Sequence, residues 1–193
     1  MEAPNPIWTI GHSNHSESRF ATLVQGEHIE LVIDVRTHPF SRYTAHFNSA
    51  PLKAWLAKDG IGYIFMGNEL GGRPPEPKLY DQEGHVDYRQ LSSLPRFLEG
   101  IERLVHESRA ARVVVMCGEE DPIDCHRRLL IARVLKERIE FLHLRGDGTV
   151  IGEGQFAQEF DLPKMPTLWS EEEPWRSIRP VLPSSLPSNS LSR

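Results

Sequence analysis

The chain has 193 residues and a mass of 22.0 kDa, which suits one compact domain and is too short for two ordinary ones. Lys and Arg number 22 against 27 Asp and Glu, a net charge of −5, so the broad positive field that non-specific duplex binding requires is absent. No apolar run approaches the roughly 18 residues of a membrane helix, and no basic stretch precedes an apolar one at the N-terminus. With only two cysteines, the chain is expected to be a cytoplasmic protein that has no secretory signal and does not cross a membrane.

Five short apolar runs rich in β-formers predict strands within the first 145 residues. In chain order they are IWTI from Ile7, LVIDV from Leu31, GYIFM from Gly62, RVVVM from Arg112 and EFLHL from Glu140. Most are continuously apolar rather than alternating, which is typical of strands that are covered on both faces.

Helical patterns lie between these runs. The first helix is expected to begin at Ser16, the second at Ser49 and the fourth at Asp124, because each is a good N-cap residue. Gly26 and Gly60 are the expected ends of the first two. The third helix carries its apolar positions at Phe97, Ile101, Leu104 and Val105.

The alternation of strands and helices predicts a parallel sheet with right-handed crossovers. We expect an α/β fold, with an open, mainly parallel five-stranded sheet and helices on both faces in a Rossmann-like three-layer arrangement. A single domain is expected over residues 6–162, with a long loop insertion at about 67–93 that is typical of a lid or binding loop. Residues 163–193 hold six prolines and seven serines, which predicts a tail that is either wrapped on the surface, docked through Trp169 and Trp175, or disordered.

Unusual residues gather in the loops that follow the predicted strands. Ligands bind beyond the carboxyl ends of the strands in an open parallel sheet, so these loops are expected to share one site. They contain both cysteines and four of the nine histidines: Cys117, Cys125, His12, His15, His38 and His126. We expect a small anionic ligand there, with nucleic acid as the other candidate partner.

The loop after the fourth strand is the richest in reactive groups. If Asp124 caps the helix, Cys125, His126 and Arg127 occupy its first turn. There the helix dipole and the neighbouring cations lower the pKa of a thiol. Cys125 is then either a reactive thiolate or a small buried residue that packs the helix start, whereas Cys117 is expected in the core. Because a helix N-terminus disfavours a cation, Arg127 is expected to have an anionic partner in the pocket.

Two familiar kinds of site fit this loop poorly. In a phosphatase-type loop an Arg follows the nucleophilic Cys after a few residues, but nine residues separate Cys117 from Arg127 and four of them are acidic. Cys117, Cys125, His126 and His12 offer ligands that suit zinc or iron. No familiar metal-ligand spacing supports such a site, and the adjacent Cys125 and His126 are not expected to face one ion. No metal residue is therefore assigned, and the cofactor is left open.

Candidate roles follow from residue chemistry and from position after the strands. Catalytic roles are predicted for Cys125, His126, His12 and Glu119. Binding roles are predicted for Gly11, Ser13, Asn14, Asp34, Arg36, Ser41, Gly71, Gly72, Arg127 and Cys117. Asp34 and Arg36 share a strand face, so they either reach a ligand together or form a structural ion pair.

The motifs TIGHSN from Thr9, IDVRTHPFSR from Ile33, HFN from His46, ELGG from Glu69 and MCGEEDPIDCHRRLL from Met116 resemble the bacterial and archaeal domain-of-unknown-function 488 family. They run in order from about residue 8 to 145. The resemblance implies an α/β domain and no generally assigned activity. It implies these signature residues: Gly11, His12, Ser13, Asp34, Arg36, Pro39, Ser41, Cys117, Glu119, Cys125, His126 and Arg127.

A second similarity, at the level of the fold, is to rhodanese domains, which carry sulfur on a cysteine; by that analogy Cys117 would be the nucleophile. Three functions stay open. The one we favour is an enzyme acting on a nucleotide or nucleic-acid-related anionic substrate. The others are a non-catalytic nucleotide- or nucleic-acid-binding module and a thiol-based sulfur-transfer or redox enzyme. A binding module would use a basic patch formed by Arg36, Arg42, Arg73, Arg127 and Arg128.

Overall fold

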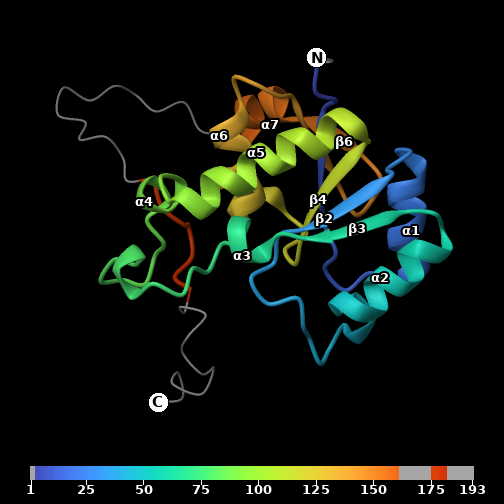
Figure 1. Cartoon of the computed structure of the whole chain (residues 1–193), viewed down its shortest axis with the longest axis horizontal. Helices are drawn as coiled ribbons and strands as arrows, with labels where there is room; N and C mark the ends of the chain where they lie inside the picture. The colour runs from blue at the N-terminus through green and yellow to red at the C-terminus, as the bar shows by residue number, and fades with distance from the viewer. Residues whose placement is uncertain (1–2, 161–174, 182–193) are drawn as a thin grey trace.

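The computed structural model describes residues 3–160 and 175–181, and Figure 1 shows how their elements are arranged. A six-stranded sheet forms the centre, in the order β3-β2-β4-β1-β5-β6. The strands are β1 (Ile7–Gly11), β2 (Leu31–Asp34), β3 (Gly62–Phe65), β4 (Val113–Cys117), β5 (Phe141–Leu144) and β6 (Val150–Gly152). Neighbouring strands are parallel except β5 and β6, which are antiparallel. The predicted α/β class and mainly parallel sheet are confirmed.

The sheet has one strand more than the five that the sequence predicts. β6 lies at the edge and follows a turn in which Gly148 has a φ of 99° and the amide of Arg145 donates to the Thr149 carbonyl. Three residues are too few to show a hydrophobic period. Its position therefore follows from pairing with β5, which the sequence pattern does not reveal.

Helices cover both faces of the sheet, as expected (Figure 1). The α-helices are α1 (Glu17–Gly26), α2 (Ser49–Lys58), α3 (Gly67–Leu70), α4 (Tyr88–Ser92), α5 (Pro95–Ala110), α6 (Arg133–Leu135) and α7 (Glu153–Phe160), and a π-helical segment, Arg127–Ala132, leads into α6. On one face α5 packs against Ile33 and Val115, while on the other α1 and α2 pack against Ile10 and Val114. Successive strand residues thus enter opposite cores, which explains why the strands are continuously apolar.

The ends of the helices agree in part with the sequence. Ser16 caps α1, its hydroxyl accepting from the Arg19 amide at 3.1 Å. The cap of α2 is Asn48 rather than Ser49, which is the first helical residue. Gly60, with a φ of 75°, follows the end of α2 as expected.

The predicted cap at Asp124 is wrong. Pro122–Asp124 forms a 3-10 turn that Asp121 caps by accepting from the Ile123 amide at 2.9 Å. Cys125 is extended, and helical structure begins only at His126. The proline after Asp121 starts this separate turn, so the chain reaches Cys125 before the helix begins.

Residues 67–93 pack beside the segment 175–181. The Tyr88 amide donates to the Trp175 carbonyl at 2.9 Å, and the Ser177 amide donates to the Val86 carbonyl at 2.9 Å. The Trp175 indole donates to the Leu129 carbonyl at 2.7 Å. Most of the predicted tail, including Trp169, lies outside the described residues, and the domain limits of 6–162 stay a prediction. Within 3–160 and 175–181, no helix combines the length and apolar character that crossing a membrane demands.

Candidate active site

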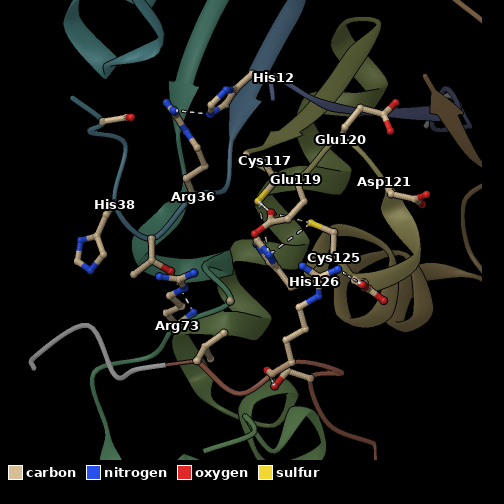
Figure 2. A pocket seen from close by; sticks show the side chains of 18 of the residues that line it. His12, Arg36, His38, Arg73, Cys117, Glu119, Glu120, Asp121, Cys125 and His126 are labelled. Atoms are coloured by element: carbon tan, nitrogen blue, oxygen red, sulfur yellow. Dashed lines mark hydrogen bonds and ion pairs between the residues drawn. The ribbon is translucent and has the colours of Figure 1, made fainter. Parts of the chain in front are cut away.

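A cavity of about 630 Å³ opens at the carboxyl ends of β1, β2 and β4 (Figure 2). These strands come together because β4 lies between β1 and β2 in the sheet. Several of the predicted site residues line the cavity: His12, Arg36, Ser41, Gly72, Cys117, Glu119, Cys125 and His126. The cavity therefore lies where ligands bind in open parallel sheets.

Two thiols, an imidazole and a carboxylate converge on the cavity floor (Figure 2). The Sγ atoms of Cys117 and Cys125 each lie 3.8 Å from Nδ1 of His126. Oε2 of Glu119 lies 2.8 Å from the Cys117 sulfur and 3.4 Å from the Cys125 sulfur. We call these four residues the floor cluster. Both cysteines are buried and free of any disulfide.

The expectation that Cys125 and His126 cannot face one point is wrong. Cys125 has φ −100° and ψ 139°, whereas His126 has helical values of −60° and −22°. The change of conformation between them lets adjacent side chains converge, which a regular helix would prevent. Nε2 of His126 lies 3.1 Å from the Val35 carbonyl; it donates there in the tautomer that leaves Nδ1 facing the sulfurs.

The pKa values of the two thiols are shifted in opposite directions. The hydrogen bond with Cys125 and burial both raise the pKa of Cys117 well above its ordinary value. Burial opposes ionisation of Cys125, but the Cys117 hydrogen bond, the Arg127 charge and His126 together lower its pKa well below its ordinary value. Cys125 is thus the more acidic thiol of the floor cluster.

Glu119 and His126 complete the charge distribution of the floor cluster. Burial alone would raise the pKa of Glu119, but the Cys117 hydrogen bond and the His126 charge lower it to about 2. Burial disfavours charged His126, yet its hydrogen bond with Cys125 and the nearby negative charges raise its pKa. Glu119 is therefore ionised at neutral pH and accepts hydrogen bonds only.

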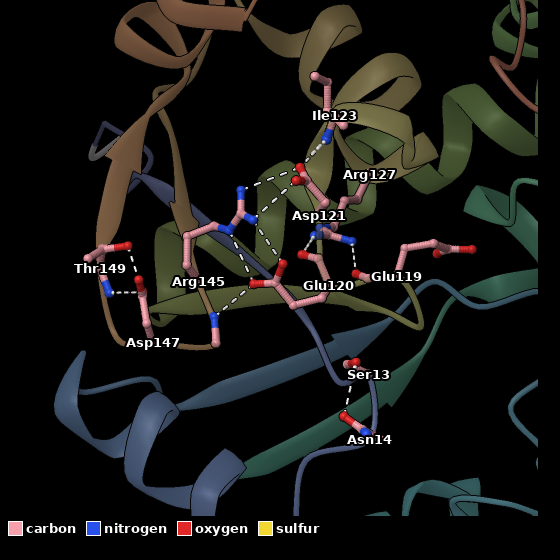
Figure 3. Close-up of polar contacts among 11 residues, drawn as sticks. Ser13, Asn14, Glu119, Glu120, Asp121, Ile123, Arg127, Arg145, Asp147 and Thr149 are labelled. Carbon is pink, nitrogen blue, oxygen red and sulfur yellow. Dashed lines mark hydrogen bonds and ion pairs between the residues drawn. The ribbon is translucent and has the colours of Figure 1, made fainter.

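Arg127 lies beneath the floor and not in the cavity lining. Its guanidinium donates to the backbone carbonyls of Glu119 and Glu120 at 2.5 and 2.6 Å (Figure 3). It is 1% exposed and has no carboxylate partner among residues 3–160 and 175–181. Its charge in turn lowers the pKa of the Cys125 thiol. The guanidinium is thus held by a pair of backbone carbonyls rather than by a ligand in the cavity.

One wall of the cavity is a pre-formed polar network. The Arg36 guanidinium donates to both carboxylate oxygens of Asp34, at 2.9 and 2.6 Å, and to the Phe47 carbonyl at 2.7 Å. It also donates to Nε2 of His12 at 3.0 Å, while Nδ1 of His12 donates to the Ser13 carbonyl at 2.8 Å. Burial and the Arg36 charge lower the pKa of His12 to about 4. Asp34 and Arg36 form the structural ion pair that the sequence left as one of two readings.

The acidic side of the cavity is neutralised from outside. Both carboxylate oxygens of Glu120 accept from Arg145, at 3.1 and 2.9 Å, and Asp121 accepts from the same guanidinium (Figure 3). Asp124 pairs with Arg179 at 2.6 Å. Of the four acidic residues that argued against a phosphatase-type loop, three are thus paired with arginines, and Glu119 is the one that belongs to the floor cluster.

The cavity mouth carries exposed cationic and aromatic groups. Phe40 is 72% exposed, and Arg73 and His38 are also exposed and line the cavity. The Arg73 guanidinium has no ion-pair partner within the described parts of the chain. Ser41 shapes this loop, since its hydroxyl accepts from the amides of Tyr43 and Thr44 at 3.1 and 3.3 Å.

The basic patch predicted for a binding module is not formed. Arg36, Arg127 and Arg128 are 7%, 1% and 4% exposed. Of the five arginines, Arg42 and Arg73 are exposed. The others are held inside the protein by polar partners, which charge counts along a sequence do not reveal.

Other predicted residues support the cavity without lining it: Gly11, Ser13, Asn14, Asp34 and Gly71. A Cβ on Gly11 would lie 1.8 Å from the Glu119 carbonyl oxygen, and one on Gly71 would lie 2.3 Å from the Gly67 carbonyl. Both glycines therefore permit close backbone packing. Ser13, with a φ of 44°, and Asn14 form the turn after β1 and bond to each other at 3.4 Å (Figure 3).

Sequence reasoning missed the contribution of the C-terminal segment. Ser177, Arg179, Pro180 and Val181 line the cavity about fifty residues after the floor cluster. The sequence feature that indicated docking of this segment was Trp175, whose indole donates a hydrogen bond to the Leu129 carbonyl.

A family model described as "Domain of unknown function DUF488" matches residues 16–134. This match covers more than half of the chain. The chain belongs to the DUF488 family. Within this DUF488 protein the match includes the floor cluster and Arg36, whereas His12 precedes it and the segment 175–181 follows it. No curated protein and no solved structure matches the chain, and the similarity to rhodanese domains stays a prediction.

Proposed function

We propose that this protein is an enzyme that acts on a nucleotide or nucleic-acid-related anionic substrate. The observation that carries the proposal is the floor cluster, in which four titratable side chains meet at the bottom of an open cavity. Burying ionisable groups costs stability, and strongly shifted pKa values concentrate at functional sites. An α/β fold can be packed without buried ionisable groups of this kind, so we attribute the floor cluster to catalysis rather than to stability.

The substrate class follows from the cavity mouth. Arg73 and His38 offer donors to an anionic group, and Phe40 offers an exposed ring against which a base can stack. Arg36 is assigned a positioning role instead, because Asp34 and His12 already occupy its guanidinium. A nucleotide bound in this way has its phosphate at the mouth.

Proton transfer at the floor is assigned to Glu119. Its carboxylate is ionised at neutral pH and lies beside the two sulfurs on the cavity surface. It can accept a proton from a substrate or water group held within hydrogen-bond reach. Both ring nitrogens of His12 already have hydrogen-bond partners, the Ser13 carbonyl and Arg36, so His12 is assigned the role of orienting Arg36.

Binding of AMP, GMP, CMP and UMP, measured separately by isothermal titration calorimetry, tests the substrate class. Arg73→Ala is expected to weaken binding of the preferred nucleotide about 10- to 100-fold, since a hydrogen bond to a charged group contributes about 1.5–3 kcal/mol. Arg42→Ala is the matched control, because Arg42 is exposed and follows Ser41 in the chain but does not line the cavity. Equal losses in the two variants, or no binding by the wild-type protein, would contradict the proposal.

Turnover separates an enzyme from a binding module. The preferred nucleotide is incubated with wild-type protein and followed by proton and phosphorus NMR. The enzyme predicts a new product with the wild type, and with Glu119→Gln it predicts nucleotide binding without product. A non-catalytic module predicts no product from either protein and unchanged binding in Glu119→Gln.

A further inference from the structure

We infer that Cys117, Cys125 and His126 bind a zinc ion on the cavity floor. Their ligand atoms, two Sγ and Nδ1, all lie within 4.8 Å of one another, and all three residues are buried. Thiolate sulfur and imidazole nitrogen are the ligands that zinc prefers. Such a group is unlike an exposed acidic cluster, because three soft or borderline donors from two separate segments meet away from solvent.

The spacing of the donors fits tetrahedral coordination. Zinc–sulfur and zinc–nitrogen bonds of about 2.3 and 2.0–2.1 Å place sulfur and nitrogen about 3.6 Å apart at a tetrahedral angle. Both observed Sγ–Nδ1 distances are 3.8 Å. Both sulfurs therefore lie near tetrahedral bonding geometry relative to the imidazole nitrogen, and all three ligand atoms lie within 4.8 Å of one another.

The surroundings orient the imidazole as a metal ligand. Nε2 of His126 lies 3.1 Å from the Val35 carbonyl, and a ligating histidine almost always donates its other ring nitrogen to such a partner. Gly72 holds the other side of the ring, since a Cβ there would lie 2.7 Å from Cγ and 2.8 Å from Nδ1 of His126. Nδ1 is thus directed toward the two sulfurs.

The charges beneath the floor suit a thiolate-bound ion. Arg127 is fully buried, with two carbonyl acceptors and an Nε that has no hydrogen-bond partner among the residues that the structure describes. Two thiolates and the Glu119 carboxylate carry one negative charge more than a zinc ion neutralises, and Arg127 compensates for it. Binding requires both sulfurs and Nδ1 of His126 to be free of protons, so any proton on them is released to water.

All three donor residues line the cavity, so a fourth position on the ion would be accessible from it. Two cysteines and one histidine leave a tetrahedral zinc with one open position, which is typical of catalytic zinc sites. Glu119 lies beside it, 2.8 Å from one ligand sulfur and 3.4 Å from the other. A zinc ion there would lower the pKa of a bound water, and Glu119 is placed to receive the proton of that water. This role of the ion rests on the function proposed above, whereas binding of the ion does not.

Metal content tests the site directly. The protein is expressed without a polyhistidine tag, purified with a phosphine reductant, dialysed and measured by plasma mass spectrometry. We expect close to one zinc per chain, and its loss in Cys125→Ser and His126→Gln. His38→Gln is the matched control, because His38 lines the same cavity outside the floor cluster. Two results would overturn the inference. One is a zinc content in both ligand variants equal to that of the wild type, and the other is no zinc bound by the wild type after exposure to zinc.

Cobalt binding provides a test that needs no ligand variant. Wild-type protein freed of metal is titrated with cobalt(II) and followed by absorption spectroscopy. Intense visible bands of tetrahedral cobalt with a sulfur-to-cobalt charge-transfer band are expected. Cobalt bound without the charge-transfer band would overturn the assignment of the cysteines.

Gly72→Ala tests the orientation of His126 while leaving every ligand in place. The added Cβ displaces the imidazole, so zinc affinity is expected to fall about 10- to 100-fold, as it does when support of a ligand is lost. Gly26→Ala is the matched control, since no atom lies within 4 Å of its Cβ position. Unchanged zinc affinity in Gly72→Ala would contradict the role of His126.

The outcomes for metal and substrate are distinguishable. Zinc bound through the three ligands without nucleotide conversion supports the metal site and refutes the proposed function. Equal nucleotide conversion by zinc-free and zinc-loaded protein refutes the role of the ion in turnover.

Discussion

Acidification is expected to destabilise the protein through His12. Its imidazole is 7% exposed, stacks on Phe47 with ring centroids 4.5 Å apart, and accepts a hydrogen bond from Arg36. Protonation removes that acceptor and places a second cation beside the guanidinium. The native state therefore holds His12 neutral, with its pKa lowered by burial and by Arg36 to about 4.

The size and sign of the effect follow from linkage. The pKa of His12 is about 4 in the native protein and 6.5 in the unfolded chain, so the unfolded state binds the proton first as the pH falls. The contribution to stability is complete above pH 6.5 and is lost progressively toward pH 4. A difference of about 2.5 pH units corresponds to about 3 kcal/mol of unfolding free energy.

Urea unfolding between pH 7.5 and 4 measures this loss. His12→Gln removes the titration but keeps an amide oxygen that can accept from Arg36, so its unfolding free energy is expected to fall by about 3 kcal/mol less than that of the wild type over this range. His106→Gln, at an exposed position on α5, controls for removal of a histidine. NMR titration of the His12 ring gives the pKa itself. A midpoint near 6.5, or equal pH dependence in wild type and His12→Gln, would refute the reasoning.

Two further substitutions test the packing around the cavity. Gly11→Ala places a methyl group 1.8 Å from the Glu119 carbonyl oxygen, so urea unfolding should show a loss of about 3 kcal/mol in the free energy of unfolding. Unchanged stability would mean that the loop containing Glu119 moves away from the methyl group without cost. Trp175→Phe removes the indole bond to Leu129, which should cost about 1 kcal/mol and speed amide exchange at Tyr88, whereas unaltered exchange there would show that the indole does not hold the segment.

Five of the six strands were predictable, because most of them are continuous apolar runs. The end of the second helix at Gly60 was predictable because its positive φ suits glycine. Parallel strands end at one edge, so the convergence of His12, Cys117 and Cys125 also followed from the pattern alone. The floor cluster itself did not, because it depends on the conformational change between Cys125 and His126. That change is a matter of two backbone dihedrals, which composition does not encode.

The least predictable part of the site was which arginines are paired inside the protein and which face the cavity. In the sequence Arg36 and Arg127 are candidates to bind an anionic ligand, yet one is held by Asp34 and His12 and the other by two carbonyls. Arg73 has no such partner in the described residues and is the cation that faces the mouth. The difference arises from contacts between segments far apart in the chain, such as those that bring Arg145 and Arg179 to the acidic side.

The position of the segment 175–181 has a consequence for how this cavity can vary. It adds Arg179 and Pro180 to the wall, but it is attached through Tyr88 and Leu129 and contributes nothing to the floor cluster. It also lies beyond the part of the chain that matches the family model. Substitutions in this segment can therefore change which molecules enter the cavity without altering the floor cluster. The selectivity of the cavity and the reactivity of its floor are thus encoded in separate stretches of the gene.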